Sequence, residues 1–421
     1  MKKPTLILLF ILMLLGPLSS QDVRSKNETP LTLNQCIQKA LQNNPLILSS
    51  YQQYEAALAR VNQAKAFAQP SVNWDSDLQP RLFDFTGTGE WYFGLSQSIE
   101  FPGKRSLRGK IALKESKELM REIDQLELDI TFQVKEAFYR LLLAQEKQKY
   151  AEENLSLSRD FLDKARLKYE TGDTAQVEVL RAQVEASRAA TNLRQAANEV
   201  RLAKAYLNYL MARRKYAPLN ITGKLRKKPV SLDLEELKER AFNFRPELRR
   251  NQLAQERLDL QKKQAYMNYL PDFDLGVNRH KVMGEGEWWD VTLSFPIPLF
   301  FWQPAKGEVA EAQATLRSLN RENQHLENTI SLEVEEAYMN AQSTENQILL
   351  FEDEILSQAE EVYQMFLFSY QEGEIEGIEL IDARRTLLEA RTSYADVLYN
   401  YGVALAALEK SIGTSLEGEQ P

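Results

Sequence analysis

An internal duplication constrains this chain more than any other feature, because the second half repeats the pattern of the first about 201 residues later. The residues that recur at this offset are Leu31, Leu33, Ala40, Pro45, Glu55, Ala64, Pro70, Tyr169 and Gly172, paired with Leu232, Leu234, Ala241, Pro246, Glu256, Ala265, Pro271, Tyr370 and Gly373. The offset drifts to 198 at Gly109 and to 200 at Val134, which we expect to reflect short insertions or deletions in loops. A unit of this length is far longer than a solenoid repeat, so it indicates tandem duplication of a whole structural half.

The two ends of the chain and the region between the halves give the predicted boundaries. Residues 1–20 contain Lys2 and Lys3, an apolar run over Leu6–Leu15 and a small-residue end, which is typical of a cleaved secretory signal. We expect a first repeat at 21–216, a connector rich in proline, glycine and lysine at 217–230, a second repeat at 231–415 and a tail at 416–421. No apolar run of 18 residues follows residue 20, so any membrane-spanning part of the mature chain must be made of strands.

Each half changes from a helical period to a period of two after Pro70 or Pro271. We expect strands at about 71–82 and 90–101 in the first half and at about 272–282 and 288–298 in the second. Apolar and polar residues alternate along these segments, so each hairpin has one apolar and one polar face, with loops near 83–89 and 283–287. Aromatic residues gather at the strand ends, as they do at membrane interfaces: Phe83, Phe85, Trp91, Trp288, Phe300, Phe301 and Trp302.

Long helices are predicted on both sides of each hairpin. A first helix is expected at Leu33–Ala68 and at Leu234–Tyr269, a long one at about Arg105–Tyr169, and a returning one at Thr174–Arg213. Apolar residues recur every three or four positions over many heptads, which predicts helices packed in coiled-coil fashion. About 65 residues of helix span about 100 Å, so each half resembles a rod with a hairpin at one end and a tight turn at the other.

Four strands cannot close a barrel, and an open sheet edge cannot face lipid. If the hairpins enter a membrane, several chains must therefore pool them. Two copies would give an eight-stranded barrel, and side chains would fill its interior. Three copies would give a twelve-stranded barrel, which leaves room for a lumen.

Composition and motifs exclude most catalytic and nucleic-acid functions. The formal net charge of -8, with both signs interspersed, argues against nucleic acid as a partner. The single cysteine, Cys36, reads as a small buried residue, and the two histidines, His280 and His325, read as surface residues. The sequence contains no nucleophile elbow, zinc-protease helix or phosphate loop. We therefore predict no enzyme, no cofactor and no metal site.

The order of signal peptide, duplicated halves and helix–hairpin–long helix pairs resembles the TolC-type outer membrane efflux proteins over essentially the whole mature chain. The two Tyr-x-x-Gly turns, at Tyr169–Gly172 and Tyr370–Gly373, carry this resemblance together with the duplication. The segment Ser98–Arg105 (SIEFPGKR), followed by Arg108, and the segment Phe295–Phe300 (FPIPLF) are similar to the heavy-metal (CzcC-like) branch of that family.

The resemblance implies a mainly α fold with a β-barrel membrane part, built as a homotrimer with a 12-stranded outer membrane barrel and a 12-helix periplasmic α-barrel. It implies that the protein extends from the outer membrane of a Gram-negative bacterium, where it contacts lipid, into the periplasm. The implied partners are a periplasmic adaptor (membrane fusion) protein and an inner-membrane proton-driven RND-type pump. The implied function is a passive export duct for metal ions or small molecules.

The resemblance also suggests roles for particular residues. It places the periplasmic aperture gate at Glu379 and Asp382, and Ile375 stands where we would expect a locking arginine. In the first half the matching positions are Glu178 and Arg181, so only the second half carries two acids. Adaptor docking is expected at the two turns, at Tyr169, Gly172, Thr174, Tyr370, Gly373 and Glu374. Independently of the resemblance, Gly103, Lys104 and Arg105 are expected to break the strand and to place cations at the boundary between membrane and periplasm, where the barrel joins the helices.

Two alternatives remain open from the sequence. A non-membrane periplasmic coiled-coil scaffold or adaptor explains the long helices but not the amphipathic hairpins. For Glu374, Glu376 and Glu379, a preference of carboxylates for the positive N-terminal end of a helix explains the residues without any gate.

Overall fold

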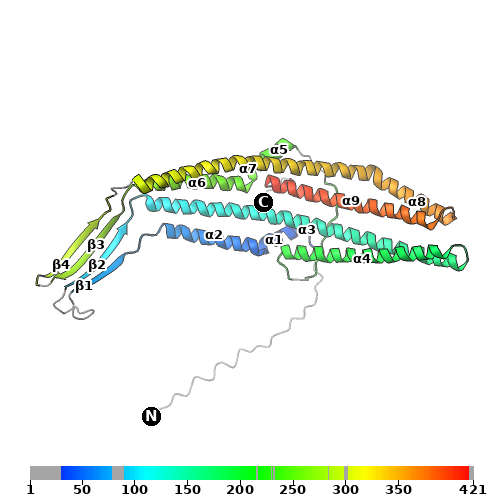
Figure 1. Cartoon of the computed structure of the whole chain (residues 1–421), viewed down its shortest axis with the longest axis horizontal. Helices are drawn as coiled ribbons and strands as arrows, with labels where there is room; N and C mark the ends of the chain where they lie inside the picture. The colour runs from blue at the N-terminus through cyan, green and yellow to red at the C-terminus, as the bar shows by residue number, and fades with distance from the viewer. Residues whose placement is uncertain are drawn as a thin grey trace, which may run out of the picture.

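The computed structural model describes residues 30–77, 90–214, 217–228, 230, 233–282, 284–297 and 302–416. Helices form a long, gently curved layer, and a small sheet extends from one end of it (Figure 1). The first half contains α1 (Leu33–Asn43), α2 (Pro45–Ala64), β1 (Ser71–Asp77), β2 (Glu90–Ile99), α3 (Lys104–Glu170) and α4 (Gln176–Leu210). The second half repeats this order with α5 (Leu234–Phe244), α6 (Pro246–Met267), β3 (Phe273–Val282), β4 (Gly286–Ser294), α7 (Trp302–Leu350), a π-helical turn (Phe351–Ile355), α8 (Leu356–Glu372) and α9 (Gly377–Ile412).

The prediction of one continuous first helix in each half is wrong. In the first half the chain leaves helical geometry at Asn44 (ψ 123°), and a new helix starts with Pro45. Arg245 and Pro246 do the same in the second half. Proline disfavours the helical region for the residue before it and fits the first position of a helix, so the Asn-Pro and Arg-Pro pairs each end one helix and begin another.

The expectation that every change of offset between the halves lies in a loop is also wrong at one position. Equivalent buried residues lie 200 apart before the π-helical turn, as at Val134 and Val334, and 201 apart after it, as at Ser158 and Ala359. A π turn closes its hydrogen bonds one residue further along the chain than an α turn, so it can hold one extra residue within a helix. The extra residue therefore lies inside the helix at Phe351–Ile355.

The predicted heptad core is confirmed on the long helices. Its members in the middle of α3 and α7 are at most 8% exposed: Ile130, Val134, Ala137 and Leu141, with Ile330, Val334, Ala337 and Ala341. None of the described helices is long and apolar enough to cross a membrane.

In the described part of the chain, four strands form one antiparallel sheet in the order β1-β2-β3-β4. Both predicted hairpins are present, and they are joined through pairing of β2 with β3, in which Leu95 faces Val277. The last strand is displaced from its predicted bounds of 288–298: β4 begins at 286 and ends at 294, and position 298 lies outside the described residues. The predicted segment 78–82, the loop at 83–89, Met283 and the aromatics Phe83, Phe85, Phe300 and Phe301 lie outside the described residues.

The register gives the sheet one apolar and one polar face, as the alternation predicts. Val72, Leu95, Val277 and Val291 form one cross-strand row, and the next row contains Asn73, Gly94, Asn278 and Asp290 on the opposite face. The apolar side chains are not covered within the chain: Val291 is 74% exposed, Leu293 63% and Phe295 52%. A contiguous exposed apolar face of this kind marks contact with lipid or with another protein surface.

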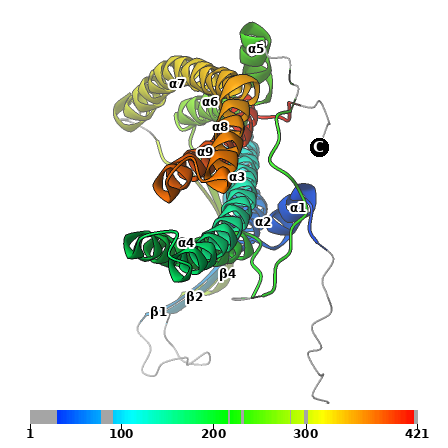
Figure 2. The same ribbon diagram turned by 90° about the vertical axis from the view of Figure 1, so that its right-hand side faces the viewer.

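The helices form a curved strip with two open sides (Figure 2). In the described residues α3 packs against α2, α4, α6 and α9, and α7 packs against α6 and α9. Thus α2 and α4 lie at one side of the strip, and α7 and α8 lie at the other. Because β1 follows α2 and β4 precedes α7, the two edges of the sheet continue the two sides of the helical strip.

Candidate functional site

The two turns at the end far from the sheet have the same backbone geometry (Figure 1). Gly172 and Gly373 have φ values of +83° and +80°, which glycine adopts without strain. In each turn the amide after the glycine donates to a carbonyl five residues earlier, Asp173 to Lys168 (2.8 Å) and Glu374 to Ser369 (2.9 Å). This pattern closes a helix C-terminus, so the glycines have a structural reason to be present whether or not a partner docks there.

The side chains of the two turns are less alike than their backbones. Tyr169 is 46% exposed, whereas its counterpart Tyr370 packs against Phe161, with ring centroids 5.5 Å apart. Thr174 is half-buried, and Glu374 is exposed and accepts a hydrogen bond from Ser369 Oγ at 3.2 Å. The candidate docking residues therefore offer a partner two different surfaces, one on each turn.

The two turns are packed into one block by contacts between the halves. Gly377, the first residue of α9, lies so close to α3 that a Cβ there would stand 2.6 Å from Phe161 Cζ. An apolar cluster continues from this contact: Phe161, Leu162, Ala165, Ala182, Leu380 and Ile381 are buried in it. The close approach requires glycine at 377, a requirement that the sequence alone did not reveal.

The two candidate gate residues lie on one exposed face of α9, within its first two turns. The spacing of three residues predicts that Glu379 and Asp382 share a helix face, and both are exposed in the structure. Asp382 accepts a hydrogen bond from Arg385 at 3.3 Å, and Arg385 also contacts Glu185 of α4 at 3.3 Å. Glu379 has no ion-pair partner among the described residues, so its charge is the less compensated of the two.

The first half compensates its acid locally. Glu178 is half-buried and pairs with Arg181 at 3.1 Å on the same helix. Burial and the nearby Glu178 carboxylate raise the pKa of Tyr370, which keeps this phenol neutral.

The position where a locking arginine was expected holds Ile375, which is half-buried and carries no charge. Arg385 is one of the cations that link α9 to the helices of the first half, and the sequence analysis missed it because its partner Glu185 lies 200 residues away.

At the other end of the layer, the candidate junction residues connect strands to helices. Gly103 precedes α3 with a φ of +106°. Lys104 Nζ donates to Leu270 O (2.7 Å) and to Asp272 Oδ1 (2.9 Å), which also accepts from the Phe101 amide. Burial tends to raise the pKa of Asp272, but these hydrogen bonds hold it below its ordinary value. Lys104 thus ties the start of α3 to the start of β3.

Two arginines of α3, Arg105 and Arg108, connect the end of α2 to the junction between β2 and α3. The Arg105 guanidinium lies over the Phe67 ring at 3.5 Å from its centroid. Arg108 donates to Ala64 O at 2.8 Å and pairs with Glu100 at 2.5 Å. The cations of the FPGKR segment and Arg108 therefore hold strand and helix together within the chain.

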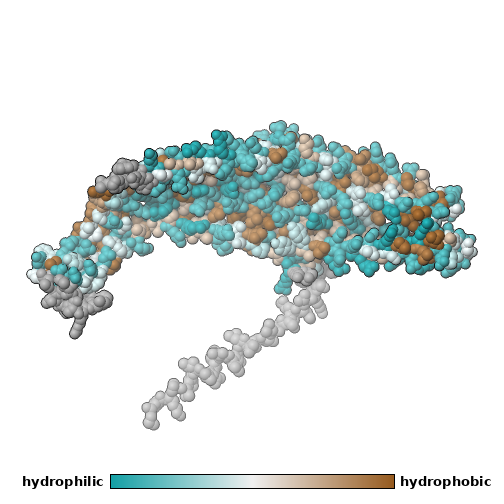
Figure 3. All heavy atoms as spheres, in the orientation of Figure 1, coloured by the Kyte–Doolittle hydropathy of each residue, from teal (hydrophilic) through white to brown (hydrophobic). Residues whose placement is uncertain are grey.

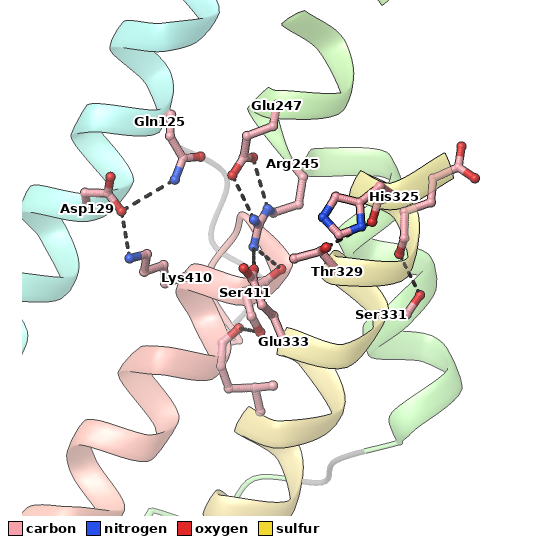
Figure 4. A network of polar contacts seen from close by, with 12 residues as sticks. Gln125, Asp129, Arg245, Glu247, His325, Thr329, Ser331, Glu333, Lys410 and Ser411 are labelled. Carbon is pink, nitrogen blue, oxygen red and sulfur yellow. Dashed lines mark hydrogen bonds and ion pairs between the residues drawn. The ribbon is translucent and has the colours of Figure 1, made fainter. Parts of the chain in front are cut away.

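Neither histidine lies in a group of ligands suited to a metal. His280 Nδ1 is 2.7 Å from Asp290 on the polar face of the sheet, and its ring stacks on Tyr92. His325 lies on α7, where its backbone oxygen accepts from Thr329 (Figure 4). Within the described ranges, no three His, Cys, Asp or Glu side chains gather closely enough to hold a metal ion.

Comparison with known proteins places this geometry in a family. The profile of the family "Outer membrane efflux protein" matches residues 36–213 and 237–414, two stretches whose boundaries are also 201 residues apart. The cobalt-zinc-cadmium resistance protein CzcC of Cupriavidus metallidurans is 23% identical over 407 residues, covering 91% of this chain and 90% of that protein.

Solved structures share the fold at low sequence identity. A membrane protein from Pseudomonas aeruginosa has a TM-score of 0.77 at 15% identity, covering 92% of this chain and 91% of that one. CusC, solved in a study of folding and transmembrane channel formation, has a TM-score of 0.76 at 18% identity, covering 91% of this chain and 92% of its own. The duplication, the fold and the profile match together show that this chain belongs to the family of outer membrane efflux proteins.

Proposed function

We propose that three copies of this chain close into one tube that spans the outer membrane and extends through the periplasm. One observation carries the proposal: the chain forms a strip that is open on both sides, in its sheet and in its helical layer alike. β1 and β4 each pair on one side only among the described strands. Different edges joined head to tail, with a rotation that closes, generate a ring.

The sides of the helical strip carry the apolar residues that such joints need. On α4, Val177, Leu180 and Val184 are each about half exposed, and on α8 Met365 and Phe368 are 56% and 62% exposed. Figure 3 shows a hydrophobic patch near the end of the molecule that carries the two turns. Spacings of three and four residues give each side an apolar stripe suited to coiled-coil packing against the next copy.

In the closed tube, the apolar face of the sheet would contact lipid and the polar face would line the lumen. Three copies of four strands give a 12-stranded barrel with room for a water-filled interior. The exposed Val291, Leu293 and Phe295 favour this arrangement over a periplasmic scaffold, which would leave these side chains in water.

The tube would act as a passive duct, with a periplasmic adaptor at the two turns and an inner-membrane proton-driven pump supplying the cargo. The similarity to CzcC makes divalent metal ions the first cargo to test, with small organic molecules as the alternative. A duct of this kind needs no metal ligands of its own, because selection is the task of the pump.

Assembly and conductance test the proposal together. The mature protein, extracted in mild detergent, should have the mass of three chains and should form ion-conducting channels in planar bilayers. In cells it should remain in the outer membrane fraction after salt and carbonate washing. A mature protein that is soluble and monomeric without detergent would rule out the channel.

A further inference from the structure

The connector and its flanks are the most basic part of the chain. Residues 211–232 contain seven basic and no acidic side chains: Arg213, Arg214, Lys215, Lys224, Arg226, Lys227 and Lys228. The whole chain has 52 basic and 60 acidic residues, so the rest of it carries 45 basic residues against 60 acidic ones. The connector is therefore a strongly positive segment in an acidic protein.

Some of these cations form hydrogen bonds or ion pairs within the fold, and others form none with the described residues. Arg213 donates to Pro218 O at 3.2 Å, and Lys227 pairs with Glu345 at 3.0 Å. The side chains of Arg214, Lys224 and Arg226 are exposed and have no ion-pair or hydrogen-bond partner among the described residues. Within the described part of the chain, no contact explains the charge of these three side chains.

A fourth exposed cation, on α1, lies close to this segment. Lys39 lies one turn after Cys36 on α1, and Cys36 belongs to the buried cluster that also contains Met211 and Leu219 at the start of the connector. The Lys39 side chain is exposed and has no ion-pair partner in the described part of the chain. We call Lys39, Arg214, Lys224 and Arg226 the basic belt.

The connector packs on the convex side of the helical strip (Figure 2), about midway along its length (Figure 1). A Cβ on Gly223 would lie 3.2 Å from the Phe138 ring, and Leu31 exchanges backbone hydrogen bonds with Asn220 and Thr222. Phe138 is 34 residues from the start of α3 and 32 from its end, so the belt lies about 50 Å along the helix from either end. It is remote from the sheet and from the two turns.

We propose that the basic belt binds the peptidoglycan layer through the carboxylates of its peptide stems. The inference rests on the proposed function: with the sheet in the outer membrane and the turns directed toward the inner membrane, the belt faces the middle of the periplasm. Lipid head groups and a partner at the turns are both out of reach at that distance. An extended anionic polymer is the partner that complements an unpaired ring of cations.

The chemistry predicts multivalent, salt-sensitive binding. Guanidinium and ammonium groups form charge-assisted hydrogen bonds with carboxylates, but each exposed pair contributes little. A trimer would present twelve belt cations to a polymer with many carboxylates, so weak contacts would add through avidity. Screening by salt should weaken all of these contacts together.

Co-sedimentation with purified, insoluble peptidoglycan sacculi tests the proposal on the detergent-solubilised protein. The wild-type protein should pellet with sacculi at about 50 mM salt and remain in the supernatant at about 500 mM. The triple variant Arg214→Gln/Lys224→Gln/Arg226→Gln should pellet at least about fivefold less at low salt. The control Lys110→Gln/Lys117→Gln/Lys263→Gln removes the same charge from exposed, unpaired positions elsewhere and should pellet like the wild type.

Three results would overturn the proposal: no pelleting of the wild type with sacculi, equal pelleting of the belt variant and the wild type, or stronger binding to phosphatidylglycerol vesicles than to sacculi. Trimer mass and bilayer conductance are measured on the same samples. Loss of sacculus binding by a variant that conducts normally supports the belt. A wild-type protein that binds sacculi without conducting would contradict the proposed channel and leave the belt standing.

Discussion

Asn44 and Arg245, which are 201 residues apart, each donate a side-chain hydrogen bond of 3.2 Å to a carbonyl 166 residues further along, Asn44 to Leu210 and Arg245 to Ser411. Both stand at the break between the two short helices of their half, and both are 5% exposed. Each half therefore has a hydrogen bond between the break in its first helical segment and its last helix, although the residue type at the break differs.

The change from an amide to a guanidinium requires counterions. Arg245 pairs with Glu247 at 2.7 Å and with Glu333 at 2.7 Å (Figure 4). Removing one partner of a buried charged network leaves the others uncompensated, which typically costs about 3–5 kcal/mol. Removing a buried neutral hydrogen bond leaves a smaller penalty of about 1–3 kcal/mol.

We therefore expect Arg245→Ala to destabilise the protein more than Asn44→Ala does. Denaturant unfolding of the detergent-solubilised protein, followed by circular dichroism, measures both variants under one condition. Equal midpoints for the two variants would mean that the acidic partners of Arg245 find water or other cations when it is lost.

The single cysteine offers a second test of the fold. Cys36 is 0% exposed, and burial raises the pKa of its thiol to about 11. Below that pH the thiol stays protonated, and only the thiolate reacts with alkylating reagents. We expect iodoacetamide to leave Cys36 unmodified at pH 8 in the native protein and to label it fully in denaturant, as mass spectrometry would show. Rapid native labelling would contradict the packing of α1.

The parts of the fold that the sequence predicts are those with a local period. The alternation of Phe93 and Leu95 with Gly94 predicts the faces of the sheet, and the heptads through Val134 and Val334 predict the buried stripes of α3 and α7. The breaks before Pro45 and Pro246 depend on the restriction that proline places on the preceding residue, which a prediction from apolar periodicity alone does not include.

Other features depend on contacts that no local pattern encodes. The π-helical turn is visible in the sequence only as a change of offset from 200 to 201, which does not say whether a loop or a helix holds the extra residue. The contact of Arg385 with Glu185 and the need for glycine at 377 arise where the two halves meet. Both require knowledge of how the halves pack.

Strand facing can be tested with a pair of neighbouring substitutions. Leu293 lies on the apolar face, and Thr292 lies on the polar face opposite Gly276. Arginine on a lipid face near the middle of a bilayer costs about 2–4 kcal/mol, whereas a lumen position tolerates it. We expect Leu293→Arg to reduce the trimer yield in outer membranes strongly and Thr292→Arg to reduce it little. Comparable yields would show that the facing, or the barrel, is wrong.

Docking at the turns can be tested by crosslinking in cells. A photoreactive residue at Glu374, which is exposed, should capture the adaptor efficiently. The same residue at the half-buried Thr174 should capture it less, because part of that site faces its own chain. Lys224, on the connector, serves as the control. Adaptor captured from Lys224 alone would place the docking surface at the middle of the molecule instead of its end.

The gate gives the last prediction. Glu379 and Asp382 are exposed on one face of α9, and of the two only Asp382 has an ion-pair partner among the described residues, Arg385. In a closed trimer, three copies of this pair at the narrow end would attract cations and repel anions. Glu379→Ala/Asp382→Ala should therefore raise single-channel conductance in planar bilayers and weaken both cation selectivity and block by divalent ions.

A matched variant separates a gate from general surface charge. Glu361→Ala/Glu372→Ala removes the same charge from exposed positions on α8, which precede the turn. It should leave conductance, selectivity and divalent block unchanged, because these carboxylates do not share the face of Glu379 and Asp382. If both double variants behaved like the wild type, the acid at 379 would be explained by its place in the first turn of α9, where a carboxylate favours the positive end of the helix. If both raised conductance equally, the narrow end would respond to total charge and not to these two side chains.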